Sequence, residues 1–170
     1  KLAWTNGYYI RNTPSDLLLS KIYAWAEKFE VDLLCKVKDG SFNQKVLDLV
    51  KERMKLLSDF NDSTQYFYIV PSVPFDMLVK YAEKDKTLAI LEGLSSLYEG
   101  VANWTSTDID TLSHEFASRE GHSPKEAFMT LRVAVTGNTA TPPIFDVCAV
   151  LGKEEVLARI QMAVNTLKSI

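Results

Sequence analysis

The setting of Arg53 is the first sign of chemistry in the sequence. On a helical wheel at about 100° per residue, the apolar residues of the predicted helix 41–57 form one arc, and Arg53 is the only charged residue inside it. A guanidinium is a planar fork of donors, so it can bind the acceptor edge of a flat polar partner. The same position also suits an arginine that is merely paired, or that snorkels, near a helix C-terminus.

A second group of candidate residues surrounds a Thr-Pro-Pro turn near the C-terminus. A hydroxyl and the free N–H groups of a helix start could bind polar atoms there, an apolar shelf could stack a flat ring, and an arginine could reach the turn from the preceding helix. The same residues also form an ordinary helix start, with an N-cap, a proline at the first helical position and apolar side chains in the core. The group consists of Arg132, Thr141 (the N-cap), Pro142 (the first helical residue), Ile144 and Phe145.

Catalytic patterns are missing from the chain. It contains no glycine-rich phosphate loop, no Gly-x-Ser-x-Gly elbow and no Cys-x-x-Cys pair. His114 and His122 are the only histidines, and His114 lacks the second histidine four residues on that a helical zinc site needs. A small metal-dependent hydrolase that uses these two residues is therefore an unfavoured alternative. The sequence predicts no metal site and does not support catalysis by this chain alone.

The composition is that of an ordinary globular protein. The 170 residues are 46% hydrophobic and 24% charged, with no apolar stretch of the roughly 20 residues that span a bilayer. The N-terminus has no secretion signal, and it lacks an initiator Met, which suggests a processed chain or a fragment of a longer one. We expect a cytoplasmic location. Cys35 and Cys148 are the only cysteines, and we expect both to be free and buried.

The charge is unevenly distributed along the chain. A net charge of −3 argues against a broad, sequence-blind nucleic-acid binder. Residues 1–57, however, hold 10 Lys and Arg against 7 Asp and Glu, while residues 58–170 hold 9 against 15. A partner that carries phosphates would therefore meet the first part more readily.

Helix signals dominate the sequence. The best is Ser123-Pro124-Lys125-Glu126, which combines a capping hydroxyl, a proline at the first helical position and a capping-box glutamate. We also expect N-caps at Thr13 and Ser41, and helix stops at Gly137 and Gly152. The predicted helices are residues 17–29, 41–57, 75–83, 86–103, 107–119, 124–135, 141–150 and 154–168.

Strand signals are few. Residues 66–70 are aromatic and β-branched, but one short strand cannot form a sheet by itself, so we expect an extended packing segment. The polar, proline-containing turn of residues 59–72 is the best internal boundary. We therefore predict an all-α fold of two consecutive small helical bundles, residues 1–73 and residues 74–170, with little or no sheet.

Two segments resemble one known family. The N-terminal run Lys-Leu-Ala-Trp-Thr-Asn-Gly-Tyr-Tyr-Ile-Arg resembles the Lys-Leu-x-Trp-x-Asn-x-x-Tyr-Ile stretch that follows the catalytic half of bacterial-type glutamyl-tRNA synthetases. The run Leu-Arg-Val-Ala-Val-Thr-Gly, the Thr-Pro-Pro turn, Ile-Phe and Leu-Gly-Lys resemble the closing segment of the same enzymes. The two ATP-binding signatures of that family, of the His-Ile-Gly-His and Lys-Met-Ser-Lys-Ser types, are absent from this sequence.

The resemblance implies a tRNA-binding role for the chain. In that family this region is helical and binds the anticodon end of glutamate tRNA, while the catalytic half uses ATP and magnesium; this fragment would need no cofactor. The resemblance implies that Arg53 contacts the third anticodon base, and that Arg132, Thr141, Pro142, Ile144 and Phe145 hold the first two. Pro143 departs from the family, which often has Gly there, and a proline supplies no N–H for a backbone contact.

Other residues have less specific expectations. Lys36, Lys38, Lys45, Lys51 and Lys55 could contact phosphates, although a solvated helix face explains each of them equally well. We expect Trp4 and Asn6 to fix the entry segment by packing and not by RNA contact. The parent enzyme would be a cytoplasmic monomer without membrane contact. The alternative function is a helical protein–protein interaction module without an RNA role, which the negative charge and the apolar helix faces would also suit.

Overall fold

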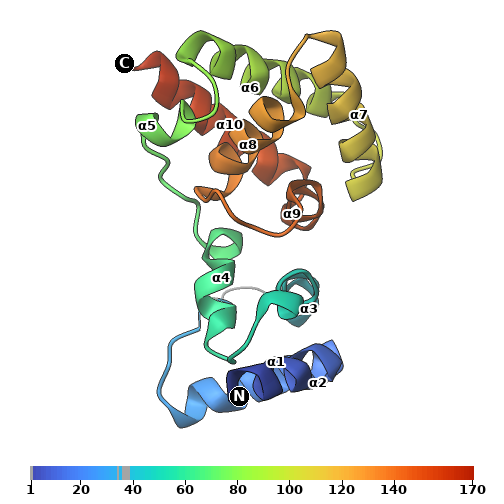
Figure 1. Cartoon of the computed structure of the whole chain (residues 1–170), viewed down its shortest axis with the longest axis vertical. Coiled ribbons are helices and arrows are strands. Elements are labelled where there is room, and N and C mark those ends of the chain that lie inside the picture. The colour runs from blue at the N-terminus through green and yellow to red at the C-terminus, as the bar shows by residue number, and fades with distance from the viewer. Residues whose placement is uncertain (1, 34, 36–38) are drawn as a thin grey trace. The chain divides into compact units, whose positions relative to one another are not determined.

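The fold was analysed in a computed structural model, which describes residues 2–33, 35 and 39–170. Every regular element in these ranges is a helix, which confirms the predicted all-α class (Figure 1). The elements are α1 (Leu2–Asn12), α2 (Ser15–Lys28), α3 (Gly40–Val50), the 3₁₀ turn η2 (Lys51–Arg53), α4 (Asp59–Tyr68), α5 (Phe75–Leu78), α6 (Lys84–Glu99), α7 (Ser106–Arg119), α8 (Pro124–Thr136), α9 (Ile144–Leu151) and α10 (Lys153–Lys168).

The helices form two compact units. Unit 1 spans Lys1–Ile69 and contains α1 to α4; unit 2 spans Val70–Ile170 and contains α5 to α10. Two consecutive helical bundles are therefore present, as predicted. The assignment of residues 1–73 and 74–170 as two anticodon-binding subdomains stays a prediction.

A buried asparagine anchors the core of unit 1. The Asn43 side-chain N–H₂ group donates to the Tyr23 hydroxyl at 2.9 Å and to the Cys35 carbonyl at 2.9 Å, while the Tyr68 hydroxyl donates to the Asn43 amide oxygen at 3.0 Å. Burial raises the pKa of Tyr68, so its hydroxyl keeps its proton and remains a donor. Because the Asn43 amide is hydrogen-bonded, its burial lowers the stability of the fold only slightly. Its partners on α2 and α4 join these helices to α3.

Helix α3 ends seven residues earlier than predicted, at Val50 and not at residue 57. The carboxylate of Asp59 accepts hydrogen bonds from the backbone N–H groups of Lys55 and Leu56 at 2.8 and 3.0 Å. A continuing helix would have paired those two N–H groups with carbonyls four residues back. The side chain of Asp59 therefore replaces the helix, and the chain turns through η2.

The segment preceding Ile69 is helical, so the prediction of an extended run over residues 66–70 is wrong for most of its length. Phe60, Thr64 and Phe67 are buried at helical spacing on one side of α4. Packing of this face outweighs the local β-propensity of the aromatic residues. Helix α1 was not predicted at all.

Two predicted N-caps are also wrong. The Thr13 hydroxyl donates back to the Tyr9 carbonyl at 2.7 Å and does not cap α2. Helix α3 begins at Gly40, and its cap is Asp39, whose carboxylate accepts from the Phe42 N–H at 2.9 Å. An aspartate two residues before the predicted cap performs the same function.

In unit 2, helices α6 and α10 pack against each other and against the shorter helices around them. The predicted helices 86–103, 107–119, 124–135 and 154–168 are confirmed with small shifts of their ends, whereas α5 stops at Leu78. Tyr98 is fully buried, and its hydroxyl lies 2.8 Å from that of Ser113. Cys35 and Cys148 are free and buried, as predicted.

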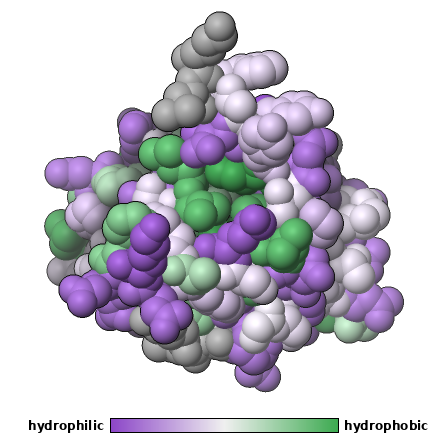
Figure 2. All heavy atoms as spheres, turned by 90° about the horizontal axis from the view of Figure 1, so that it is seen from below, coloured by the Kyte–Doolittle hydropathy of each residue, from purple (hydrophilic) through white to green (hydrophobic). Residues whose placement is uncertain are grey.

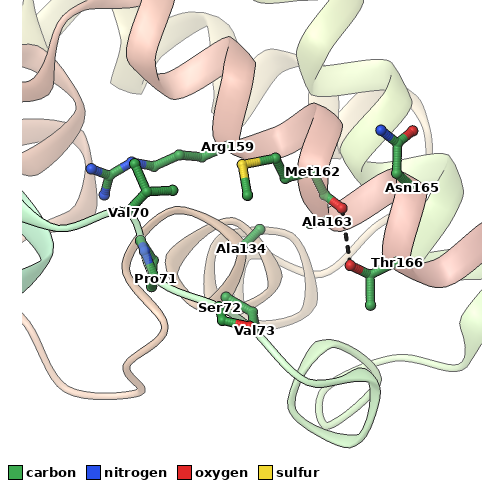
Figure 3. A pocket seen from close by; sticks show the side chains of 10 residues that line it. All are labelled: Val70, Pro71, Ser72, Val73, Ala134, Arg159, Met162, Ala163, Asn165 and Thr166. Carbon is green, nitrogen blue, oxygen red and sulfur yellow. Dashed lines mark hydrogen bonds between the residues drawn. The ribbon is translucent and has the colours of Figure 1, made fainter.

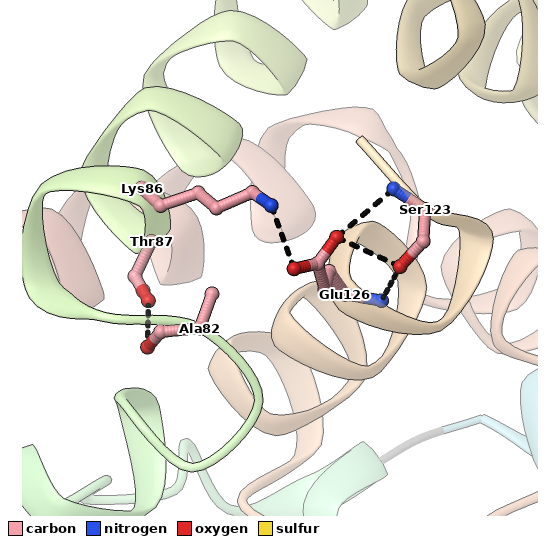
Figure 4. Close-up of polar contacts among 5 residues, drawn as sticks. All are labelled: Ala82, Lys86, Thr87, Ser123 and Glu126. Carbon is pink, nitrogen blue, oxygen red and sulfur yellow. Dashed lines mark hydrogen bonds and ion pairs between the residues drawn. The ribbon is translucent and has the colours of Figure 1, made fainter. Parts of the chain in front are cut away.

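The start of α8 is fixed by a complete capping box. The Glu126 N–H donates to the Ser123 hydroxyl at 3.2 Å, and the Ser123 N–H donates to the Glu126 carboxylate at 3.0 Å. Lys86 of α6 binds the other oxygen of that carboxylate at 2.6 Å (Figure 4). The same glutamate therefore caps α8 and joins it to α6.

The end of α8 is fixed by Gly137. Its φ of 66° is left-handed, and its N–H donates to the Val133 carbonyl at 2.8 Å. A β-carbon at this position would lie only 2.9 Å from the β-carbon of Pro71. Gly137 is therefore required twice, by its backbone angle and by the approach of the segment at residues 70–73.

Replacement of glycines can separate these two requirements. Gly121 has a similar φ of 70° but no atom within 4 Å of its would-be β-carbon. We expect Gly121→Ala to lower the free energy of unfolding by about 1 kcal/mol through backbone strain alone. Gly137→Ala should cost at least about 2 kcal/mol, because overlap with Pro71 is added. Urea unfolding followed by circular dichroism measures both, and equal losses would contradict the role of Pro71. Gly40→Ala, with open space and no left-handed φ, is the control.

The contact between Lys86 and Glu126 predicts that the stability of the folded protein depends on pH. Hydrogen bonds from Lys86 and Ser123 lower the pKa of Glu126 from 4.5 to about 2. Because the pKa is lower in the folded protein, the stabilisation is present above pH 4.5 and is lost as the pH falls from 4.5 toward 2. Lys86→Met should raise this pKa and flatten the acid limb of stability. An NMR titration of the Glu126 carboxyl carbon measures this pKa. The control is Lys125→Met, which removes a neighbouring exposed lysine and should leave the pKa of Glu126 unchanged.

Candidate nucleic-acid interface

Arg53 is the last residue of η2, and its side chain is exposed. The predicted placement inside a buried apolar arc is therefore wrong, because the helix on which that wheel was drawn ends at Val50. The alternative of a paired arginine is not observed either: among the described residues the guanidinium has neither a hydrogen bond nor an ion pair. Arg53 is therefore an exposed arginine at the end of a short 3₁₀ turn.

Helix α1 packs directly against this turn. Gly7 is buried there, and a β-carbon on it would lie 3.5 Å from the Met54 carbonyl oxygen, one residue beyond Arg53. This distance is an ordinary van der Waals contact, so Gly7 lies directly beside the backbone of the turn. The position of η2, and with it that of Arg53, is thus held from one side by α1 and from the other by Asp59.

The predicted packing of Trp4 and Asn6 is wrong for this chain. Trp4 is 72% exposed and stacks on Tyr8, with ring centroids 6.2 Å apart and planes at 21°, and Asn6 is exposed as well. Figure 2 looks onto the side that α1 and α2 occupy at the bottom of Figure 1 and shows hydrophobic side chains gathered near its centre, ringed by hydrophilic ones.

The candidate phosphate-binding lysines differ in availability. Lys45 and Lys55 are exposed. The Lys51 ammonium donates to the Ser15 hydroxyl at 3.1 Å and lies 3.8 Å from the Asp48 carboxylate, so it joins α2 to the end of α3. Lys36 and Lys38 lie outside the described residues.

Arg132 holds the turn between α8 and α9. One terminal nitrogen of its guanidinium donates to the Thr141 carbonyl at 3.1 Å, to the Pro142 carbonyl at 3.0 Å and to the Thr141 hydroxyl. Arg132 therefore does reach the turn from the preceding helix, as predicted. In this conformation the nitrogen is occupied by the protein itself, which makes the guanidinium a clamp on the backbone of the turn.

The other predicted residues of the turn are buried. Thr141 is not an N-cap, because α9 begins at Ile144 with Pro143 as its cap, and Pro142 precedes the helix. The ring of Phe145 packs edge-on against Phe128, with centroids 5.0 Å apart, and Ile144 is also buried. The expected apolar shelf is therefore part of the core in this conformation.

The solvent-facing part of the turn consists of residues that the sequence analysis did not select. Asn138, Ala140 and Pro143 are exposed, and Asn138 is itself fixed, since its N–H donates to the Thr136 hydroxyl at 3.1 Å. The sequence indicated the turn as a whole as a candidate site. Asn138, Ala140 and Pro143 face solvent because Arg132 binds Thr141 and Pro142, and because Ile144 and Phe145 pack in the core.

Arg159 is a further residue that the sequence analysis missed. It lies on α10, is only 3% exposed, and lines a cavity of about 280 Å³ whose other walls are residues 70–73 and parts of α8 and α10 (Figure 3). Within its helix it lies beside Val156 and Ile160 on the buried face, so the wheel applied to Arg53 would have found it.

A metal site is not found. The described residues contain no group of three or more His, Cys, Asp and Glu side chains that could hold a metal ion. His114 lies 2.6 Å from the Asp110 carboxylate and packs against Phe128, which accounts for its position in α7. No helix formed by the described residues has the length and apolar character to cross a bilayer.

Comparison with known proteins identifies relatives over nearly the whole chain. The family model described as "Anticodon binding domain" matches residues 18–164. A glutamate–tRNA ligase of Herpetosiphon aurantiacus is 32% identical over 99% of this chain and 35% of its own length. One of Dehalococcoides mccartyi is 30% identical over 100% of this chain and 36% of its own length. The chain thus spans about a third of these relatives.

Solved structures share the fold. A glutamate tRNA ligase from Elizabethkingia meningosepticum, crystallised in complex with its amino acid, superposes with a TM-score of 0.82 at 22% identity, over 97% of this chain and 32% of that one. The synthetase from Elizabethkingia anophelis gives a TM-score of 0.77 at 21% identity. At these identities the likeness concerns the fold alone.

A double-mutant cycle tests the clamp on the α8–α9 turn. Arg132→Gln should lower the free energy of unfolding by about 2 kcal/mol, because it leaves buried carbonyls without their charged donor. Thr141→Val alone should lower the free energy of unfolding by less than Arg132→Gln does. The two losses should fall short of additivity by at least about 0.5 kcal/mol, since both remove the same contact. Additive losses in urea unfolding would mean that the contact does not stabilise the turn.

Proposed function

Because the chain belongs to the anticodon binding domain family, we propose that it binds the anticodon loop of glutamate tRNA and serves as the recognition part of a glutamate–tRNA ligase. The relatives named above support this choice of tRNA. Since the chain spans about a third of their length, we place the ligation chemistry, with its ATP and magnesium, outside these residues. We further propose that the parent enzyme is a cytoplasmic monomer.

The observation that carries the proposal is that Arg53 is exposed on a turn that Asp59 and α1 hold in place. A cytosine offers two acceptors on its Watson–Crick edge, which a guanidinium can satisfy. A guanine presents donors on that edge and would leave the arginine unpaired. Since an unpaired buried donor costs more than a matched one gains, Arg53 favours C over G at the third anticodon position.

The α8–α9 turn is the second proposed contact. We infer that Arg132, Thr141, Pro142, Ile144 and Phe145 act through the shape that they give the turn, which presents the edges of Asn138, Ala140 and Pro143 to the first two anticodon bases. Pro143 brings no N–H to such a contact, so hydrogen bonds there would come from its neighbours.

The exposed lysines would position the RNA without selecting it. Lys45 and Lys55 lie in unit 1 near η2 in sequence, and the excess of basic residues in this part of the chain suits contacts with phosphates. Lys51 is engaged with the Ser15 hydroxyl through one of its three N–H donors, so its contribution is more restricted.

A titration at two salt concentrations distinguishes this function from a protein–protein module. The whole chain should bind a transcript of glutamate tRNA at low salt, and the affinity should fall as salt rises, because phosphate contacts release counterions. A transcript with a scrambled anticodon loop should bind more weakly. If no binding occurs at low salt, the RNA-binding role is wrong.

The role of Arg53 gives a sharper prediction. Arg53→Gln should weaken binding of the tRNA with C at the third anticodon position by about tenfold and should leave the G variant almost unchanged. Lys55→Gln is the matched control on the same turn: it should weaken both tRNAs equally, as expected of a phosphate contact. An unchanged ratio of the two dissociation constants in Arg53→Gln would remove Arg53 from the discriminating site.

A further inference from the structure

Two basic residues of α10 reach the C-terminal ends of neighbouring helices. The Lys153 ammonium donates to the carbonyls of Glu99 and Val101 at 2.7 and 2.9 Å, at the end of α6. Arg159 donates from a terminal nitrogen to the Val135 carbonyl at 2.8 Å, at the end of α8. Neither α6 nor α8 has a basic residue in its own last turn. Helix α10 therefore supplies the positive charge that both helix ends favour.

The two contacts differ in burial. Lys153 is partly exposed, whereas the side chain of Arg159 is almost completely buried, with 3% exposure. The Nε atom of Arg159 donates to the Glu155 carboxylate at 2.7 Å, which balances its charge inside unit 2. A buried arginine is retained at a desolvation cost, so its partners must hold it in one geometry.

Hydrogen bonds and the backbone of residues 135–138 connect Arg159 with the α8–α9 turn. Arg159 fixes the carbonyl of Val135, and the next residue, Thr136, donates its hydroxyl to the Arg132 carbonyl at 2.7 Å. The same hydroxyl accepts from the Asn138 N–H, and the Arg132 guanidinium binds Thr141 and Pro142. The turn is thus held at its far end by Arg132 and at its near end by Arg159.

The segment at residues 70–73 closes the same region from the other side. Pro71 lies against Gly137, the first residue after α8. Figure 3 shows Arg159 and Val70 at one end of the cavity that this segment forms with α8 and α10. The cavity borders α8 at Ala134. At the next residue the bond from Arg159 to the Val135 carbonyl holds the helix, in addition to the contact of Pro71 with Gly137.

We propose that Arg159 is a positioning residue for RNA recognition: by capping α8 it sets the direction in which the exposed part of the α8–α9 turn meets the anticodon. This role rests on the proposed function. Arg159 itself is buried and does not touch the RNA. It acts through Val135, Thr136 and Asn138, and the energy of RNA binding depends on it because the turn is ordered before the RNA arrives.

The test compares Arg159→Met with Lys153→Met in the whole chain. Both variants remove a cation of α10 from a helix C-terminus and keep an unbranched apolar side chain, but only the first affects α8. The RNA probe is a stem-loop with the anticodon loop of glutamate tRNA, with the native second anticodon base or an altered one. Affinities are measured well below the thermal midpoint of each variant.

We expect Arg159→Met to bind the native stem-loop at least about fivefold more weakly and to lose most of its preference over the altered one. Arg159→Lys, which keeps a donor and the charge, should recover part of both. Lys153→Met should lower the thermal midpoint and leave affinity and preference within about twofold of the unmodified chain. If Arg159→Met lowers only the thermal midpoint, as Lys153→Met does, the positioning role is overturned.

Amide hydrogen exchange tests the same role without RNA. The N–H groups of Gly137 and Asn138 should exchange faster in Arg159→Met and at an unchanged rate in Lys153→Met. Unchanged exchange in both variants would overturn the proposal. The proposed function fails in a different way. If Arg159→Met shows the faster exchange but the unmodified chain binds no stem-loop, the proposed function is contradicted and the role of Arg159 in ordering the turn is not.

Discussion

The unsatisfied carbonyl groups at the C-terminal end of α8 are the constraint on which unit 2 depends. A helix that ends inside a protein must find donors for its last carbonyls, and α8 carries no cation of its own there. Gly137 bonds one of them by its left-handed turn, and Arg159 bonds another from α10. These two solutions fix the direction of the chain as it leaves α8. The capping box with its link to Lys86 does the same at the other end, so the helix is held at both termini and the turn that follows is a rigid extension of it.

Unit 1 builds its exposed turn by the opposite means. There a single carboxylate, that of Asp59, removes two N–H groups from a helix that would otherwise continue, and α1 presses against the resulting turn at Gly7. The result is similar: each turn presents polar or charged groups to solvent from backbone that hydrogen bonds hold in place. In both units the candidate recognition residues lie where a helix ends. Side chains of other helices hold these ends, and in unit 2 Arg132 of α8 itself also binds the turn.

The sequence predicted the helices whose ends carry their own signals. Ser123, Pro124 and Glu126 specify the start of α8 within a few residues, and Gly137 specifies its end, so both predictions were confirmed. The errors arise where a partner distant in sequence decides. Asp59 ends α3, burial of Phe60 and Phe67 makes α4 helical, and Asp39 replaces Ser41 as a cap. For the site, the helical wheel selected Arg53 on a helix that ends before that residue. The same wheel would have marked Arg159 as a charged residue on the buried face of α10, but not its partner, which is a backbone carbonyl of α8.

The two buried cysteines have a practical consequence for the study of these turns. Thiol-reactive dyes attack the thiolate form, and burial both blocks Cys35 and Cys148 and raises the pKa of the Cys148 thiol to about 12. The native thiols are therefore protected from maleimides at neutral pH. A single cysteine introduced at Ala140, which is exposed on the α8–α9 turn, would then be labelled selectively in an otherwise unmodified chain. The fold thus provides a background on which a spectroscopic reporter can be attached beside either turn without first removing residues from the core.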